Sequence, residues 1–430
     1  MPEKIQLLPG VTLTCVPTGK FKTSCLSLNL IAQLSADTAA WNALLPRVLR
    51  RGTTRYENMD QLSAALDELY GAAITPVVRK IGECQCFGFY SEFADDDFLP
   101  AGERVLEKVA DLLGELLLSP ATRGGLLNRE YVESEKKNLI DDIRAQLNDK
   151  TTYCVNRLTS LMCQSERYGI DKYGTEKAVE SISPIKLTKY YHELLETVRI
   201  EIVYCGAARP ERVRGAMERA LAPLPRGAVS TFPVADVRIF PQEETVREFH
   251  EELDVNQGKL TMGFRMGPCM YTPNYAGMLV FNAVFGGDVT SKLFLNVRER
   301  LSLCYYASSA VNRTKGILLV YSGVEPAKFQ QAYDEILAQL EAIRAGEISQ
   351  WELTSAKRGT VNAILLSLDS LGGLEARYFE SAVTDMLLTP EELCGLVDAV
   401  TAEDVSAIAK SVMLDAVHYL KGKGGGELAT

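Results

Sequence analysis

Residues 286–306 read GGDVTSKLFLNVRERLSLCYY, and they lie between a helical pattern and two strand patterns. The apolar spacing predicts a helix over 290–300, followed by a strand over 304–311. The run from Gly286 to Lys292 superficially looks like a phosphate-binding loop. However, Ser291 stands where the Walker pattern requires a second glycine, and the preceding residues read as a helix. A helix–turn–helix connection is therefore the favoured interpretation.

The elements around this stretch repeat an order that already occurs in the first half of the chain. In the first half we expect strands over 24–33, 73–80, 84–93 and 200–205, and helices over 38–50, 59–70, 102–118, 129–147, 151–165 and 185–195. In the second half we expect strands over 259–266, 304–311, 316–322 and 416–420, and helices over 273–285, 290–300, 326–344, 348–368, 372–387 and 402–412. The same order, offset by about 220 residues, indicates a duplication.

The fold class follows from this arrangement. Each half mixes hairpin-spaced strands with helices, which predicts an α+β fold with antiparallel or mixed sheets and helices on one face of each sheet. A chain of 430 residues is long for one domain and natural for two. Prolines and a glycine cluster near the middle, so we expect a domain over 1–222, a linker over 223–240 and a second domain over 241–430.

Composition excludes several functional classes. The chain is 47% apolar, and it has 46 Lys and Arg against 56 Asp and Glu, a net charge of −10. This acidic balance disfavours a nucleic-acid partner, because phosphate contact needs basic patches. No run of 18 apolar residues predicts a membrane span, and the first residues do not resemble a secretory signal. The ten cysteines form no CxxC pair, so we expect buried, reduced thiols in a cytoplasmic protein.

Histidine is scarce, which limits histidine-based catalysis and zinc chemistry. The chain has three histidines, His192, His250 and His418, and they are far apart in the sequence. Residues 192–196 look like the start of an HExxH helix, but Glu196 stands at the second histidine position. Because that motif needs two histidines on one helix face, a surface helix is the favoured interpretation.

A family resemblance emerges when three stretches are taken together. Residues 44–53 read LLPRVLRRGT, residues 66–72 read LDELYGA, and both precede the 286–306 stretch in the expected order. Together they resemble the pitrilysin/insulinase (inverzincin) metallopeptidase family, over nearly the whole chain. The resemblance is strongest to bacterial inactive subunits that lack the HxxEH zinc motif. It implies two duplicated halves, each a mostly antiparallel sheet covered by helices, which make up half of a clamshell.

The resemblance also implies where a zinc site would lie. In active members, a helix before the Gly-Thr step carries HxxEH, whose histidines bind zinc and whose glutamate activates water. Counted back from 52–53, the histidine positions fall on Ala43 and Arg47, and the glutamate position falls on Pro46. Ala43 has no ligand atom, Arg47 is a fixed cation, and Pro46 has no carboxylate and would disturb a helix interior.

A later acidic stretch, 135–143, resembles the family's second zinc-site helix. Asp142 falls at the position of the third zinc ligand, and Glu135 matches a supporting carboxylate. With the other positions lost, the resemblance implies no metal or other cofactor in this chain, because a catalytic zinc needs three protein ligands.

The second half departs less from the family pattern. Arg298 and Tyr305 match the pair with which the family holds substrate, and Gly286 and Gly287 are expected to edge the chamber in which it is held. An arginine can bind a peptide carbonyl, and a tyrosine can donate to a developing oxyanion. The alternative interpretation is that Arg298 pairs with Glu299 at a helix end, Tyr305 packs in the core, and the glycines form a turn.

Two functions from different classes follow. The first is a non-catalytic, substrate-binding subunit of a heterodimeric zinc peptidase that acts on short unfolded peptides, with the zinc held by an HxxEH-bearing homologous partner. The second is a structural or peptide-binding homodimer, a pseudo-peptidase without a proteolytic role. A stand-alone hydrolase with an unrelated site is disfavoured, because the histidines are scattered and no GxSxG motif occurs.

Overall fold

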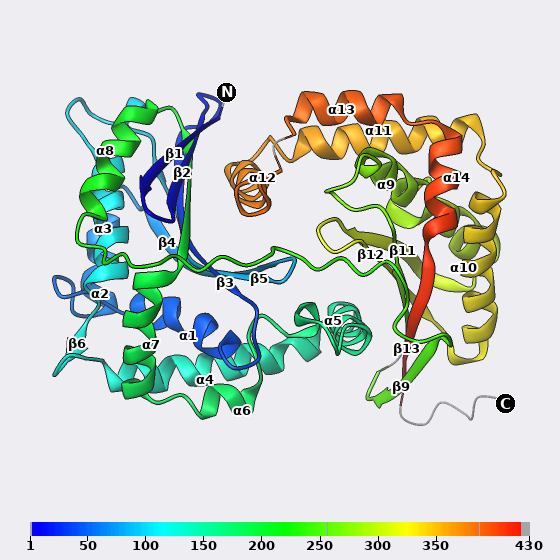
Figure 1. The fold of residues 1–430 in the computed structure, drawn as a ribbon, viewed down its shortest axis with the longest axis horizontal. Helices are drawn as coiled ribbons and strands as arrows, with labels where there is room; N and C mark the ends of the chain where they lie inside the picture. Colours follow the sequence, from blue (N-terminus) through cyan, green and yellow to red (C-terminus); the bar gives the residue numbers. More distant parts are fainter. Residues whose placement is uncertain (1, 256, 387, 423–430) are drawn as a thin grey trace. The chain divides into compact units, whose positions relative to one another are not determined.

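A computed structural model describes residues 2–255, 257–386 and 388–422 (Figure 1). The chain forms two compact units, each built from discontinuous segments. The first unit comprises Met1–Arg144, Ile170–Val234 and Ser367–Asp385, and the second comprises Ala145–Gly169, Ala235–Leu366 and Met386–Thr430. The step from 234 to 235 lies inside the expected linker 223–240. The expected domains include 145–169 in the first half and 367–385 in the second, whereas each of these segments lies in the compact unit formed mainly by the other half.

The first unit is built on a mixed six-stranded sheet. Its strand order is β1-β2-β8-β3-β5-β4, and only the β2–β8 pair is parallel. The strands are β1 (Glu3–Leu8), β2 (Val11–Pro17), β3 (Thr23–Gln33), β4 (Ala73–Ile81), β5 (Cys84–Ala94) and β8 (Arg199–Gly206), with a separate small pair β6 (Thr122–Arg123) and β7 (Leu126–Leu127).

Among the described residues, eight α-helices belong to this unit. In α3, the buried residues recur at helical spacing along one side of the helix. The helix α2 is capped by Asn58, whose side chain accepts a hydrogen bond from the Gln61 backbone N–H. The helices are α1 (Ala39–Leu49), α2 (Met59–Asp67), α3 (Val105–Leu118), α4 (Arg129–Ala145), α6 (Glu176–Glu180), α7 (Pro184–Thr197), α8 (Pro210–Ala220) and α12 (Leu371–Thr384).

Both faces of the first sheet are covered. Successive side chains of a strand point to opposite faces, and Leu26 and Leu28 of β3 enter the main core with α1 and α3. Cys25 and Ile31 of the same strand instead contact Phe379 and other apolar residues of α12. The helix α12, orange in Figure 1, lies beside the strands of this unit. The expectation of helices on one face only was therefore incomplete.

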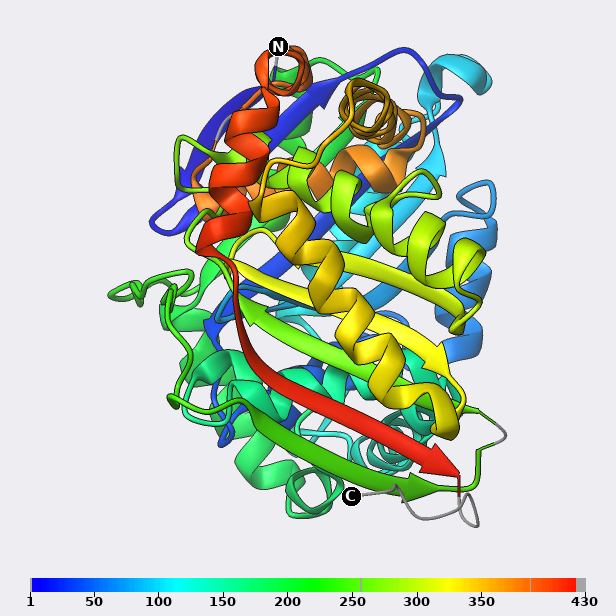
Figure 2. The ribbon, with the colours of Figure 1, turned by 90° about the vertical axis from the view of Figure 1, so that its right-hand side faces the viewer.

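The second unit repeats this plan. Its sheet has the order β11-β12-β10-β13-β9, in which only β9 and β13 are parallel; Figure 2 shows these two strands side by side. The strands are β9 (Arg247–Leu253), β10 (Gly258–Arg265), β11 (Cys304–Asn312), β12 (Ile317–Val324) and β13 (Met413–Gly422). The helices are α5 (Lys150–Met162), α9 (Tyr275–Asn282), α10 (Phe329–Arg344), α11 (Gln350–Leu366), α13 (Pro390–Ala399) and α14 (Ala402–Ser411), with π-helical segments Ala283–Gly287 and Leu293–Arg300.

The helix α5 comes from the first half of the sequence but lies in this second unit; we call α5 and α12 the exchanged helices. Its residues Leu158 and Met162 pack against Ile317 and Leu319 of β12, whereas Leu318 of that strand points into the main core. Each unit thus receives one helix from the opposite half of the sequence, and that helix covers the second face of its sheet.

Several elements were not expected from the sequence. Strands β1, β2, β6, β7 and β9 and helices α6, α8 and α13 were missed, and the helix expected over 290–300 is π-helical over Leu293–Arg300. Strands β1 and β9 are edge strands whose side chains are largely exposed or half-buried, so they lack the apolar runs that mark the buried strands. The mixed α+β architecture with two sheet-plus-helix halves was correctly predicted.

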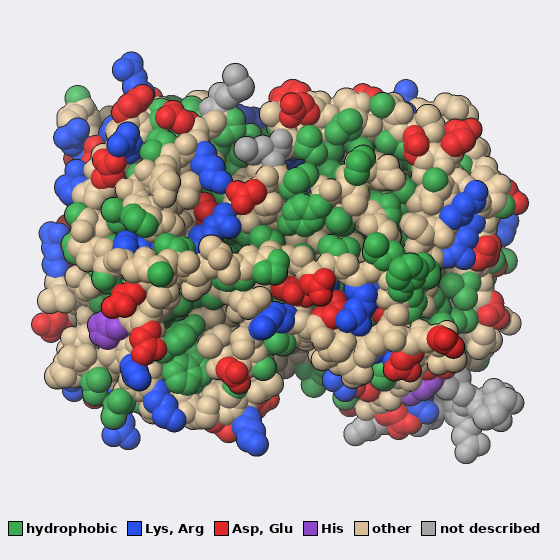
Figure 3. Space-filling model, in the orientation of Figure 1, with side chains coloured by type: hydrophobic (Ala, Val, Ile, Leu, Met, Phe, Trp, Pro, Cys, Tyr) green, Lys and Arg blue, Asp and Glu red, His purple; other side chains and the backbone are tan. Residues whose placement is uncertain are grey.

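Other expectations concern the surface and the thiols. Eight of the ten cysteines are buried, and none forms a disulfide among the residues that are described. Acidic and basic side chains are intermixed on the surface of each unit in Figure 3. Among the described helices, none combines the length and the apolar character needed to cross a membrane.

Candidate functional site

The positions where the family would hold zinc lie on α1, and they carry no ligand. Ala43 is fully buried in the core of the first unit, and Pro46 is buried inside the helix. Pro46 has no N–H, so the carbonyl of Asn42 receives no helical hydrogen bond from it. These two positions contribute packing rather than polar atoms.

Arg47 takes the third of these positions, and the neighbouring Arg51 also contacts α4. Arg47 of α1 contacts Asp142 of α4 at 2.6 Å, and Arg51 contacts Glu135 of the same helix at 3.0 Å. Arg47, Glu135 and Asp142 thus lie at the contact between α1 and α4, where guanidinium groups neutralise the two carboxylates. Arginine cannot ligate a metal, so this donor set does not fit zinc. Within the described ranges, no three His, Cys, Asp or Glu residues are grouped so that they could hold a metal ion.

The Arg47–Asp142 contact gives a first prediction. Asp142 is 53% exposed, so its ion pair is screened by water, and Asp142→Ala should lower the free energy of unfolding by no more than about 1 kcal/mol. Urea unfolding measures this change. A loss of more than about 2 kcal/mol would mean that the pair is a structural requirement of the α1–α4 contact, contrary to its exposure.

The second candidate site lies in the second unit, around Arg298 and Tyr305. Arg298 belongs to the π-helical segment Leu293–Arg300, and Tyr305 is the second residue of β11. Ser302, between them, has a left-handed backbone with φ of 49°, and its N–H binds the Arg298 carbonyl. This turn brings the chain back beside the helix end. A cavity of about 380 Å³ opens there, lined by Arg298, Glu299, Ser302, Leu303, Cys304, Tyr305, Glu325 and Lys328.

The alternative interpretation was that Tyr305 packs in the core and that Arg298 pairs with Glu299; the structure agrees with it only in part. Tyr305 is 64% exposed and so does not pack in the core; its hydroxyl lies 3.4 Å from Glu325. Arg298 does contact Glu299, but at 3.4 Å, and its guanidinium lies 4.6 Å from the centre of the Phe294 ring. Among the described residues the Arg298 guanidinium makes no hydrogen bond. An arginine that lines a cavity with unused donors can accept a ligand.

Cys304 lies in the same cavity but is poorly suited to act as a nucleophile. Burial raises the pKa of its thiol, although Ser322 and Arg298 oppose this effect. A thiol needs a lowered pKa to react as thiolate at neutral pH, so the site does not support cysteine-based hydrolysis.

Gly286 and Gly287 have a packing role. A Cβ at Gly286 would lie 2.7 Å from Leu293 Cδ1 and 2.9 Å from the Ser309 backbone nitrogen, and a Cβ at Gly287 would lie 2.5 Å from Asn282 Nδ2. The two glycines thus allow the π-helical segments and β11 to approach closely. They do not line the Arg298–Tyr305 cavity.

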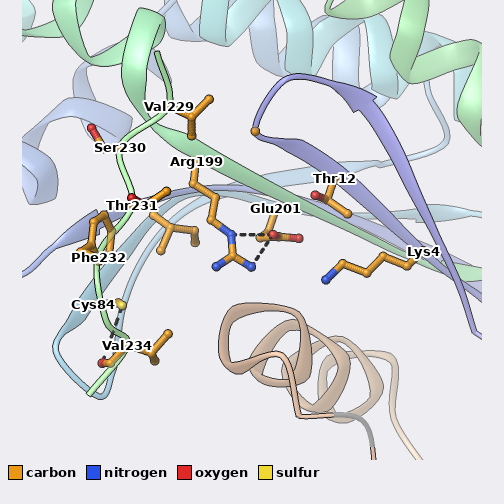
Figure 4. A pocket seen from close by; sticks show the side chains of 12 residues that line it. Lys4, Thr12, Cys84, Arg199, Glu201, Val229, Ser230, Thr231, Phe232 and Val234 are labelled. Atoms are coloured by element: carbon orange, nitrogen blue, oxygen red, sulfur yellow. Dashed lines mark hydrogen bonds and ion pairs between the residues drawn. The ribbon is translucent and has the colours of Figure 1, made fainter. Parts of the chain in front are cut away.

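A second charged cavity lies in the first unit (Figure 4). Unlike Arg298, its cations are well paired within the protein. Its arginine, Arg199, donates to Glu201 at 2.8 Å and to the Ala382 carbonyl near the end of α12 at 2.6 Å. Lys4, at the same cavity, pairs with Asp385 at 3.0 Å. These cations are engaged with the protein itself, and they fix α12, whose C-terminal carbonyls favour a positive charge.

Outside the 286–306 stretch, sequence reasoning missed two residues that line the Arg298–Tyr305 cavity, Glu325 and Lys328. They lie at the turn between β12 and α10, where the 3₁₀ segment Pro326–Lys328 forms. No motif marks them. Their only sequence signal is that they follow the strand expected to pair with the one that carries Tyr305.

The fold and the site together define a metallopeptidase-like protein whose zinc-helix positions are occupied by alanine, proline and arginine. Residues 181–360 match the family model described as the peptidase M16 inactive domain. The "Probable inactive metalloprotease YmfF" of Bacillus subtilis is 33% identical over 418 residues, which cover 97% of each chain. The chain therefore belongs to the M16 peptidase family, among its inactive members.

Solved structures agree with this assignment. A conserved protein from Enterococcus faecalis V583 is 29% identical, with a TM-score of 0.89 over 99% of this chain and 100% of that one. A peptidase M16 inactive domain from Pseudomonas fluorescens shares the fold, with a TM-score of 0.80 at 15% identity over 100% of this chain and 99% of that one.

Proposed function

We propose that this chain is the non-catalytic, substrate-binding subunit of a heterodimeric zinc peptidase that acts on short unfolded peptides. One observation carries the proposal: Arg298 lines a cavity with unused donors beside an exposed Tyr305, while the zinc-helix positions have lost every ligand. Among the described residues, the one ion pair of Arg298, with Glu299 at 3.4 Å, leaves guanidinium donors available to a ligand in this cavity. The loss of one site and the retention of the other suggest a division of labour between two subunits.

The residues of this chain would bind and orient the peptide. The Arg298 guanidinium offers a planar fork of donors for a peptide carbonyl, and the Tyr305 hydroxyl can donate to an oxygen that gains negative charge. A homologous partner with HxxEH would supply the zinc and its activated water. We also propose a cytoplasmic location, which the reduced, buried cysteines support; cell fractionation would test it.

The proposal predicts the effect of Arg298→Ala in the complex isolated with its partner. Removing a positioning donor should lower kcat/KM by about 10- to 100-fold on a quenched short peptide, with the zinc content unchanged. Arg300→Ala is a matched control, because Arg300 is 65% exposed in its side chain and only weakly paired with Glu335, at 3.8 Å. Unchanged activity of the Arg298 variant would refute its role in holding substrate.

The alternative is a homodimer that binds peptides or serves a structural role without proteolysis. The absence of zinc ligands on α1 supports this homodimer as well as it supports the non-catalytic subunit. The two functions are separated by co-purification from the native host, followed by mass spectrometry and zinc analysis. A stoichiometric partner that carries HxxEH and zinc supports the peptidase subunit, whereas a metal-free homodimer supports the alternative.

A further inference from the structure

We propose that the Arg298–Tyr305 cavity recognises a carboxylate of the bound peptide, and that Lys328 determines this preference. The inference rests on the proposed function, in which Arg298 and Tyr305 hold a peptide. It adds a substrate class, peptides whose carboxylate enters this cavity, and a residue that no motif marks. The carboxylate can be the peptide's C-terminus or an acidic side chain, which the experiment below distinguishes.

The first support is the state of Arg298. Its one ion pair is with the adjacent Glu299, at 3.4 Å, and no hydrogen bond within the described chain uses its five N–H groups. By contrast, Arg265 of the same unit binds Glu166 at 2.6 Å and Asp415 at 2.7 Å. A carboxylate is the ligand that matches a free guanidinium, since the two can form paired, parallel hydrogen bonds.

The second support is a second cation with spare donors in the same cavity. The Lys328 ammonium contacts the Ser302 carbonyl at 3.3 Å and Glu325 at 3.6 Å, which is beyond hydrogen-bond length. An ammonium has three donors, so at least one stays available. Ser302 also donates its backbone N–H to the Arg298 carbonyl. Arg298 and Lys328 both line this cavity, so a peptide bound in it meets two positively charged side chains.

The two acidic residues of the cavity, Glu299 and Glu325, balance the charges of Arg298 and Lys328. Glu299 and Glu325 pair with the two cations, but both contacts are long and the side chains are half-exposed or more. Exposed pairs of this kind contribute little free energy, so a ligand carboxylate can displace them at small cost. Because Glu325 also lies 3.4 Å from the Tyr305 hydroxyl, its negative charge opposes an anion that approaches this hydroxyl.

The experiment measures binding of three fluorescently labelled penta-alanine peptides to the purified full chain by anisotropy. One peptide ends in a free carboxylate, one in an amide, and one in an amide with glutamate at its centre. The free acid should bind about 10-fold more tightly than the plain amide. Lys328→Gln should bring this ratio close to one without weakening the amide. Glu325→Gln should raise the ratio, because it removes the competing negative charge.

Controls and outcomes separate this inference from the proposed function. Lys410→Gln, on the exposed side of α14, changes the net charge equally and should leave the ratio unchanged. Preference for the free acid alone identifies the C-terminus as the source, and equal preference for the glutamate peptide identifies a carboxylate from either source. If all three peptides bind equally and Arg298→Ala weakens them all, the carboxylate inference is wrong and peptide holding stands. If no peptide binds, both are overturned.

Discussion

Replacing Glu166 with alanine is expected to lower the free energy of unfolding of the second unit by about 3–5 kcal/mol. Glu166 contacts Arg265 at 2.6 Å and Lys315 at 2.8 Å, and both cations have fully buried side chains. Burial alone would raise the pKa of Glu166, but hydrogen bonds from these cations outweigh it and hold the pKa below its usual value. Without the carboxylate, Arg265 keeps its contact with Asp415, but Asp415 also pairs with Arg247, and the buried Lys315 loses a negative partner.

Denaturant unfolding, followed by hydrogen exchange of the second-unit strands, would measure this loss. Glu193→Ala is the control, because Glu193 forms a long, exposed pair with Lys189, and it should change the stability by less than about 0.5 kcal/mol. The lowered pKa also sets a pH dependence. The wild-type chain should keep this stabilisation above the unfolded-state pKa of glutamate and lose it as the pH falls through the lower, folded-state pKa. A Glu166 variant as stable as the control would contradict the argument.

Glu166 belongs to the segment 145–169, and sequence patterns did not predict that this segment lies in the second unit. The apolar spacing of 151–165 predicted a helix, and α5 (Lys150–Met162) is present. Periodicity shows that a helix has an apolar face, but it does not show which sheet that face covers. The exchange is specified by long-range contacts, such as Glu166 with Arg265, 99 residues apart. Alternation and helical spacing work within a window of about a dozen residues, and such contacts lie outside it.

The candidate site was also predictable only in part: the family resemblance named some of its residues, but not those that tertiary contacts bring to it. The resemblance located Arg47 and Asp142, which do meet across α1 and α4, and Arg298 and Tyr305, which share a cavity. It did not locate Lys328. Strand pairing of Cys304 with Val324 brings the turn after β12 to the site, and the left-handed Ser302 turn then places a carbonyl against the lysine. Both depend on tertiary geometry that no local pattern encodes.

The second large loss of stability is expected for Phe379→Ala, in helix α12. Phe379 is 1% exposed and packs on the second face of the first sheet, and the guanidinium of Arg79 lies 5.1 Å from its ring centre. Arg79 in turn contacts the buried Glu375 of the same helix at 2.7 Å. Truncation removes the apolar contacts and leaves a cavity beside this ion pair, so the free energy of unfolding of the first unit should fall by about 3–5 kcal/mol.

Hydrogen exchange of peptides from 367–385 and from β3 and β8 would measure where the loss falls. Because the exchanged helix covers this face of the sheet, its own amides and those of the strands beneath it should lose protection together. Phe379→Leu keeps most of the buried area and should cost less, at about 1–1.5 kcal/mol. Leu366→Ala, at a side chain that is 57% exposed, is the control for truncation without a cavity. If only the helix lost protection, α12 would be a peripheral cover rather than part of the first unit's cooperative core.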